Sequence, residues 1–182
     1  NAVLSANLQE CSFIICDCQY ICDKIINEYK INQKRVGVIA YGCDLELFAA
    51  KSPKTFNEPS LLVTRNWFPT HSNRIVLDAL QRLHSQGMDI KCTFVGDGPE
   101  LQESKRELIK NSINSNISFL GSKSPIEVAH LMETHEIYIS ASQSDGSSVS
   151  LMEALASGMI CVVSNFPSNL EWIKDRYSGF LF

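Results

Sequence analysis

Two carboxylates stand eight positions apart in the stretch SDGSSVSLMEALASG, residues 144–158. Asp145 lies in a loop of serines and one glycine, whereas Glu153 lies within LMEALAS, where its neighbours are apolar or small. An ionised carboxylate in such surroundings is costly unless a partner donates hydrogen bonds to it. That partner is either a basic side chain of the protein or a ligand with hydroxyl groups, and the residue types alone leave both open.

The loop 144–148 precedes a helix predicted over residues 148–157. The first backbone N–H groups of a helix lack partners within it, and together with the helix dipole they form an anion site suited to phosphate. Gly146 would let the main chain approach a ligand closely. Glu153 would lie roughly 8 Å along the helix axis. A ligand with a diphosphate between two hydroxylated rings, as in a nucleotide-sugar, would meet both carboxylates.

Each feature also has a simpler structural interpretation. Glu153 can form an ion pair with a neighbouring helix, and Asp145 can serve as a turn residue. A glycoside hydrolase could also use two carboxylates, but retention would need them about 5–5.5 Å apart, closer than this spacing predicts. An inverting hydrolase is compatible with the spacing, although it gives the serine loop no role. The combination of features therefore favours a nucleotide-sugar site.

Elements must position these residues, and strands and helices alternate along the chain. The expected strands cover residues 11–16, 35–40, 61–64, 90–96, 117–121, 136–142 and 159–164. Between them we expect helices around 21–29, 76–83, 99–110, 124–132 and 148–157, with a short one at 168–173. Continuous apolar strands separated by single helices indicate a doubly wound α/β domain with a parallel sheet. Ligands bind such sheets at the carboxyl ends of the strands.

Composition narrows the class of protein. The chain has 182 residues, of which 45% are hydrophobic and 20% are charged, as in ordinary globular proteins. The net charge of -4 without a basic block argues against nucleic acid as a partner. The apolar runs are too short to span a membrane. The chain lacks an initiator Met, opens as a domain interior and ends as a strand begins, so we expect a fragment truncated at both ends.

Seven cysteines are present, and three of them lie close together at Cys16, Cys18 and Cys22. Their C-x-C-x3-C spacing matches no standard zinc pattern, and no nearby His completes one. We therefore expect no metal site and interpret the cysteines as reduced, buried thiols of a cytoplasmic protein.

Several segments, taken in order, resemble family 4 glycosyltransferases, which have the GT-B fold. The pattern D-x7-E followed by ALASG resembles the E-x7-E region of that family. Five other segments occur along the chain in the order that the family shows: VGVIAYGCDLELF, LLVTRNWFP, TFVGDGP, ISFLGS and EWIKDRYSGFLF. The resemblance covers almost the whole chain. It implies a remnant of the amino-terminal acceptor-side domain at 1–40, an inter-domain linker at 41–59 and a Rossmann-like nucleotide-sugar-binding domain at 60–182.

The implied activity is sugar transfer from a nucleotide-sugar, UDP- or GDP-linked, with retention of configuration and without a metal or other cofactor. Catalytic roles would fall to Asp145 at the sugar hydroxyls, Glu153 at the ribose and Arg65 at the diphosphate. Donor contacts would come from His71, from the base-bordering loop Gly121, Ser122 and Lys123, and from Gly146, Ser147, Ser148 and Val149. The saccharide or lipid-linked acceptor would bind the other domain. Any peripheral contact with the inner membrane face would lie outside this fragment, which alone should be inactive.

Two positions depart from the family pattern. Asp145 is one methylene shorter than the usual Glu, which can shift the sugar preference. His71 stands where the family usually has a Lys, with Arg74 beyond it. Either His71 binds phosphate, or Arg74 reaches the site, or the phosphate clamp is weakened, or His71 is a solvated loop residue. The substitution supports an alternative function, a non-catalytic nucleotide or nucleotide-sugar-binding module. We expect Asp97 to shape the GDGP turn.

Overall fold

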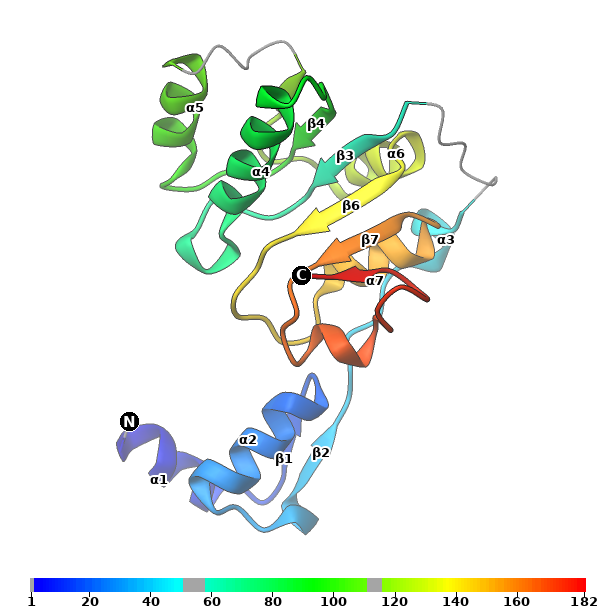
Figure 1. Cartoon of the computed structure of the whole chain (residues 1–182). Coiled ribbons are helices and arrows are strands. Elements are labelled where there is room, and N and C mark those ends of the chain that lie inside the picture. Colours follow the sequence, from blue (N-terminus) through cyan, green and yellow to red (C-terminus); the bar gives the residue numbers. More distant parts are fainter. Residues whose placement is uncertain (1, 51–57, 111–115) are drawn as a thin grey trace.

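The larger unit of the protein is built on one parallel sheet. The computed structural model describes residues 2–50, 58–110 and 116–182 (Figure 1). Six strands pair in the order β5-β4-β3-β6-β7-β8, and every pair is parallel. Their bounds are β3 Ser60–Val63, β4 Lys91–Phe94, β5 Ile117–Phe119, β6 Ile137–Ser140, β7 Ile160–Val163 and β8 Phe180–Leu181. The doubly wound α/β prediction is confirmed.

Helices cover both faces of this sheet (Figure 1). Helices α4 (Asn73–Ser85) and α5 (Leu101–Lys110) share one core with Val63, whereas α3 (Leu45–Phe48), α6 (Pro125–Thr134) and α7 (Val149–Ala156) share the other with Leu62. Adjacent residues of a strand point to opposite faces, so Leu62 and Val63 each enter a different core. Both are fully buried. The sheet is thus held from two sides, which fixes where its strands end.

Local signals in the sequence set some of the helix ends. Ser124 caps α6 in a capping box with Glu127, as the Ser-Pro start predicted. Gly158 adopts a positive φ of 70° after α7. Two predictions were inaccurate. Helix α5 begins at Leu101 rather than Pro99, because residues 99 and 100 form a turn, and the segment 168–173 forms only the 3-10 turn η3, Asn169–Glu171.

A smaller unit lies at one end of the larger one (Figure 1). Its strands β1 (Ile14–Cys16) and β2 (Val36–Val38) pair in parallel, and α1 (Ala2–Glu10), α2 (Gln19–Tyr29) and the 3-10 turn η1 (Gln33–Arg35) surround them. The sequence did not predict α1. This unit has its own apolar cluster, distinct from the two cores of the larger unit.

Part of the predicted linker 41–59 joins the larger unit. Residues 41–59 were interpreted as an inter-domain linker, but residues 45–48 within them form α3, and its Phe48 side chain is buried against α6 and α7. Residues 51–57 lie outside the described residues. The domain boundaries at 40 and 60 remain a prediction.

Two further sequence expectations concern cysteines and membranes. All seven cysteines are free, and five of them are buried. None of the helices in residues 2–50, 58–110 and 116–182 combines the length and apolarity that crossing a membrane requires.

Candidate functional site

The predicted site residues come from loops at the carboxyl ends of the parallel strands. Arg65 follows β3, the loop 121–123 follows β5, and the serine loop 144–148 follows β6 and leads into α7. Because all six strands run in the same direction, these loops share one edge of the sheet. The structure therefore brings together residues that are up to 88 positions apart, from Arg65 to Glu153.

Arg65 is the centre of a polar network. Its guanidinium pairs with the Asp145 carboxylate, and its side chain is 12% exposed. Nη1 donates to Ser148 Oγ at 3.3 Å and to Ser150 Oγ at 3.1 Å. Ser150 in turn bonds the buried Tyr138 hydroxyl at 2.9 Å. Arg65 Nε is buried without a partner among the described residues. The network fixes Arg65 and Asp145 as one unit at the start of α7.

His71 lies against this network in its neutral form. Nδ1 is 3.2 Å from Arg65 Nη2. A guanidinium can only donate, so Nδ1 accepts and the neutral ring carries its proton on Nε2. Burial, and then the Arg65 charge, lower the pKa of His71, and the nearby Asp145 charge only partly opposes this shift. His71 therefore lies beside Arg65 without adding a positive charge there at neutral pH.

Arg74, the other basic residue considered for the phosphate clamp, pairs with carboxylates of α5. Its guanidinium binds both carboxylate oxygens of Glu107 on α5, at 2.8 and 2.7 Å, and lies 3.9 Å from Glu103. These contacts raise the pKa of Arg74, first through hydrogen bonding to Glu107. Of the two residues considered at the lysine position, the structure places His71 next to Arg65 and engages Arg74 with α5.

The serine loop and the first turn of α7 present backbone donors. Ser148 occupies the N-cap position without a side-chain cap bond. In the described part of the chain, the N–H groups of Ser148 and Val149 have no acceptor. The N–H of Ser147 is already used, because it donates to Asp17 Oδ2 at 3.0 Å. The N–H groups of Ser148 and Val149 are therefore among the free donors at the amino end of α7, beside Arg65.

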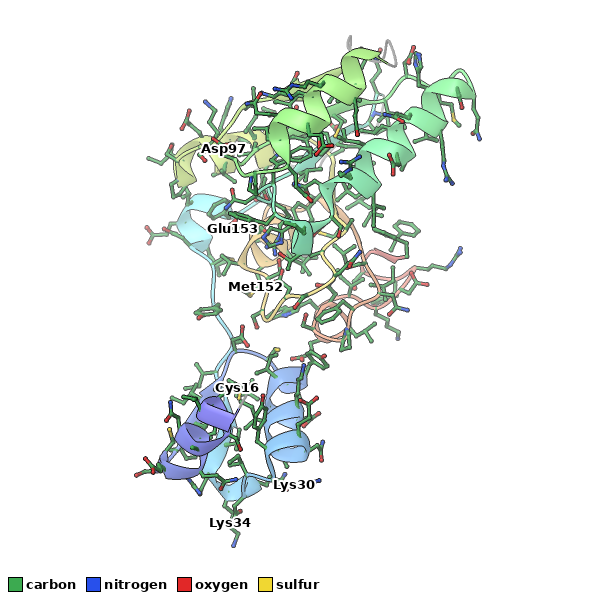
Figure 2. All side chains as sticks on the ribbon, turned by 90° about the vertical axis from the view of Figure 1, so that its left-hand side faces the viewer. Cys16, Lys30, Lys34, Asp97, Met152 and Glu153 are labelled. Carbon is green, nitrogen blue, oxygen red and sulfur yellow. The ribbon has the colours of Figure 1, made fainter. Side chains whose placement is uncertain are left out.

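Glu153 lines a cavity of about 290 Å³ together with Thr64, Ser122, Lys123 and Ser150. Figure 2 shows it in the larger unit, next to Met152 on α7. Burial raises the pKa of Glu153, and within the described ranges its carboxylate makes no ion pair or hydrogen bond. The internal ion pair considered from the sequence is therefore not found among these residues, and the carboxylate is left available to a ligand.

The loop after β5 also contributes to this cavity. Gly121 turns with φ +69°, and its carbonyl accepts from the Gly96 N–H at 2.8 Å. Ser122 and Lys123 line the cavity, while Lys123 Nζ also lies 3.0 Å from Glu127 Oε1. Two residues of the loop predicted to border the base, Ser122 and Lys123, thus line the same cavity as Glu153.

Sequence reasoning missed the residues that position Arg65. The buried Asn73 at the start of α4 donates to the carbonyl of Arg65 at 2.9 Å. Gly98 has φ +153°, and a Cβ there would lie 2.5 Å from the carbonyl oxygen of Trp67. Asp97 accepts from the Gly98 N–H at 2.8 Å, which confirms its predicted role in the turn. The sequence offered one signal for the contact of Asn73 with Arg65, namely that Asn73 is a polar residue at the start of a predicted amphipathic helix.

The arrangement has the groups needed to bind a hydroxylated anion. A guanidinium and two helix N–H groups can stabilise negative charge, and an unpaired carboxylate can accept from paired hydroxyls. The described residues contain no cluster of three or more His, Cys, Asp or Glu with metal-binding geometry.

Solved structures define the class of fold. Anabaena HepE, solved in complex with UDP and glucose, is 19% identical, and the match covers 100% of this chain and 52% of HepE at a TM-score of 0.83. The fold is therefore that of a GT-B glycosyltransferase, with its Rossmann-like parallel sheet.

The family follows from the sequence itself. The family described as Glycosyl transferases group 1 matches residues 46–182, and the chain belongs to this family. EpsF of Bacillus subtilis is 26% identical over 78% of this chain and 39% of its own length. Alpha-monoglucosyldiacylglycerol synthase of Streptococcus pneumoniae is 26% identical over 96% of this chain and 42% of its own length. The chain thus spans less than half the length of these two curated relatives.

Proposed function

We propose that this chain is the donor-binding half of a glycosyltransferase that moves a hexosyl group from a UDP- or GDP-linked donor to an acceptor with retention of configuration. Family membership supports sugar transfer, and HepE, a protein of the same fold, was solved with UDP and glucose. The observation that carries the proposal is Glu153, a half-buried carboxylate that lines a cavity and has no partner among the described residues.

In this proposal each group has a defined part. Glu153 accepts from the two ribose hydroxyls, and the loop 121–123 borders the base. The N–H groups of Ser148 and Val149 and the Arg65 guanidinium hold the diphosphate, with neutral His71 donating from Nε2. These cationic and N–H groups would stabilise the charge that develops on the leaving nucleotide.

Asp145 is proposed to accept from hydroxyls of the transferred sugar while it remains paired with Arg65. Its carboxylate has two oxygens, and each can accept more than one hydrogen bond. The ion pair uses Oδ2, and Oδ1 has no partner among the described residues, so we assign Oδ1 to the sugar hydroxyls. Because Asp145 is shorter than Glu, we propose that it selects among donor sugars.

The acceptor is proposed to be a saccharide or a lipid-linked molecule, bound outside the donor site. The pneumococcal relative carries a diacylglycerol in its name, which supports peripheral contact of the full-length enzyme with the inner face of the cytoplasmic membrane. We propose that the 182-residue chain alone binds the donor without transferring the sugar, since it spans less than half of that relative.

The test is calorimetric titration of the chain with UDP and with GDP. Glu153→Ala and Arg65→Ala should each weaken binding of the accepted nucleotide by roughly 1–3 kcal/mol, the scale of a hydrogen bond to a charged group. Glu103→Gln is the matched control, because Glu103 is exposed on α5 and should leave binding unchanged. A folded chain that binds neither nucleotide, or that binds equally well without Glu153, would contradict the proposal.

A non-catalytic nucleotide-sugar-binding module is the second candidate, favoured by the neutral His71 at the lysine position. Transfer assays on the full-length protein separate the two functions. Sugar transfer that is lost in Arg65→Ala supports the enzyme, whereas donor binding without any turnover supports the module.

A further inference from the structure

A carboxylate of the smaller unit reaches into the serine loop of the larger one. Asp17 follows β1 directly, and its Oδ2 accepts from the Ser147 N–H at 3.0 Å. Its main-chain carbonyl also accepts from the Ser147 hydroxyl. Figure 2 shows Cys16, the residue before Asp17, at the end of the smaller unit that faces the larger one. The two residues are 130 positions apart, and Ser147 is buried.

Gly146 makes this approach possible. A Cβ added at Gly146 would collide with the Asp17 carboxylate, whose Cγ would lie only 2.6 Å away. The sequence explained Gly146 by close approach of a ligand. In the structure, the group that approaches is a carboxylate of the protein itself.

Further contacts hold the segment 17–20 in place. Glu171 in η3 accepts from the backbone N–H groups of Gln19 at 3.1 Å and of Tyr20 at 3.0 Å, at the first turn of α2. The Tyr20 ring packs edge-on against Phe166 at 5.3 Å between centroids. The segment that carries Asp17 therefore contacts the larger unit at a second place, through Glu171 and Phe166.

The chemistry of this contact opposes donor binding. Asp17 takes one of the backbone donors of the proposed anion site and adds a negative charge beside the free N–H groups of Ser148 and Val149. A diphosphate placed there meets a like charge in partly buried surroundings, where water screens charges less than at a free surface. Asp145 similarly forms an ion pair with the Arg65 guanidinium. Carboxylates of the chain thus engage the Arg65 guanidinium and the Ser147 N–H, while the N–H groups of Ser148 and Val149 stay free next to the Asp17 charge.

We propose that Asp17 is an autoinhibitory latch, which holds the smaller unit against the serine loop and which the donor's phosphate must displace. The proposal rests on the proposed function for the identity of the competing anion. The latch itself is a contact between two described segments and can be measured without any nucleotide.

The first test titrates UDP into the chain and three variants by calorimetry. Asp17→Asn keeps the shape and removes the charge, whereas Asp17→Ala removes both. Asp23→Asn on the exposed side of α2 is the matched control. We expect both Asp17 variants to bind UDP about three- to tenfold more tightly, a modest gain for removing one like charge near a surface, and the control to bind as the unchanged chain does. Equal or weaker binding by Asp17→Asn, when the unchanged chain does bind, overturns the latch alone.

The second test measures amide hydrogen exchange without nucleotide. Asp17→Ala should speed exchange at Ser147, because that N–H loses its acceptor, while amides in the core strand β3 stay protected. Unchanged protection at Ser147 overturns the latch whatever UDP does. Failure of every variant to bind either UDP or GDP overturns the competition and the proposed function together.

Discussion

Glu153 is a carboxylate whose burial has no compensation from the described residues. It lies on α7, lines the cavity and has a pKa raised by burial alone. A protein tolerates an unpaired, half-buried charge where a ligand supplies the missing donors. At the scale of the residue, the proposed function therefore predicts that the ionised Glu153 lowers the stability of the free protein and that ligand binding restores it.

That cost should depend on pH. A raised folded-state pKa means that ionisation of Glu153 destabilises the fold as pH rises from its ordinary value of 4.5 through the raised value. Glu153→Gln should therefore raise the melting temperature by about 2–4 °C at pH 7.5 and by little at pH 4, on the scale of 1 kcal/mol for a chain of this size. The exposed Glu103→Gln is the control in the same melts. An equal effect at both pH values would contradict the unpaired buried carboxylate.

His71 gives a second prediction at this scale. Its neutral ring lies beside Arg65 where a lysine would add a charge. His71→Lys should tighten UDP binding about three- to tenfold by adding a charge-assisted contact to the diphosphate. His130→Lys, at an exposed position of α6 away from this site, introduces a lysine at a distance and should have little effect. If His71→Lys weakens binding, His71 does not occupy the phosphate clamp.

At the scale of the element, the turn between β4 and α5 positions the Arg65 loop. Gly98→Ala would place a Cβ 2.5 Å from the Trp67 carbonyl oxygen and should lower the free energy of unfolding by about 1–3 kcal/mol. Gly87→Ala is the matched control, since Gly87 also has a positive φ but has open space around it. Urea unfolding of the two variants compares them. A loss no greater than that of Gly87→Ala would show that the close packing is unimportant.

The elements were largely predictable because each carries a local signal. The i, i+3, i+4 pattern from Val76 to Leu83 predicted α4, and Ser124 with Pro125 predicted the start of α6. The short α3 carries no period, since four residues make barely one turn, and only the burial of Phe48 against α6 and α7 fixes it. Boundaries shifted where a turn replaces the first helical residues, as at Pro99.

The candidate site was predictable only in part, for a reason that belongs to the whole molecule. Asp145 and Glu153 could be named because they flank the start of a helix that follows a predicted strand, and Arg65 could be named through the resemblance to family 4 glycosyltransferases. Asp17 could not be named, because its contact joins two units and depends on how the chain between them folds. The ion pair between Arg65 and Asp145 was also not predicted, because the sequence pattern assigned Arg65 to the diphosphate and Asp145 to the sugar.

The most direct measurement is a structure of this chain in complex with UDP. Our account predicts the ribose hydroxyls within hydrogen-bonding distance of the Glu153 carboxylate and the phosphates at the N–H groups of Ser148 and Val149, with Asp17 withdrawn from Ser147. UDP bound at another place, or bound at this edge of the sheet with Glu153 making no contact to the ribose, would contradict it.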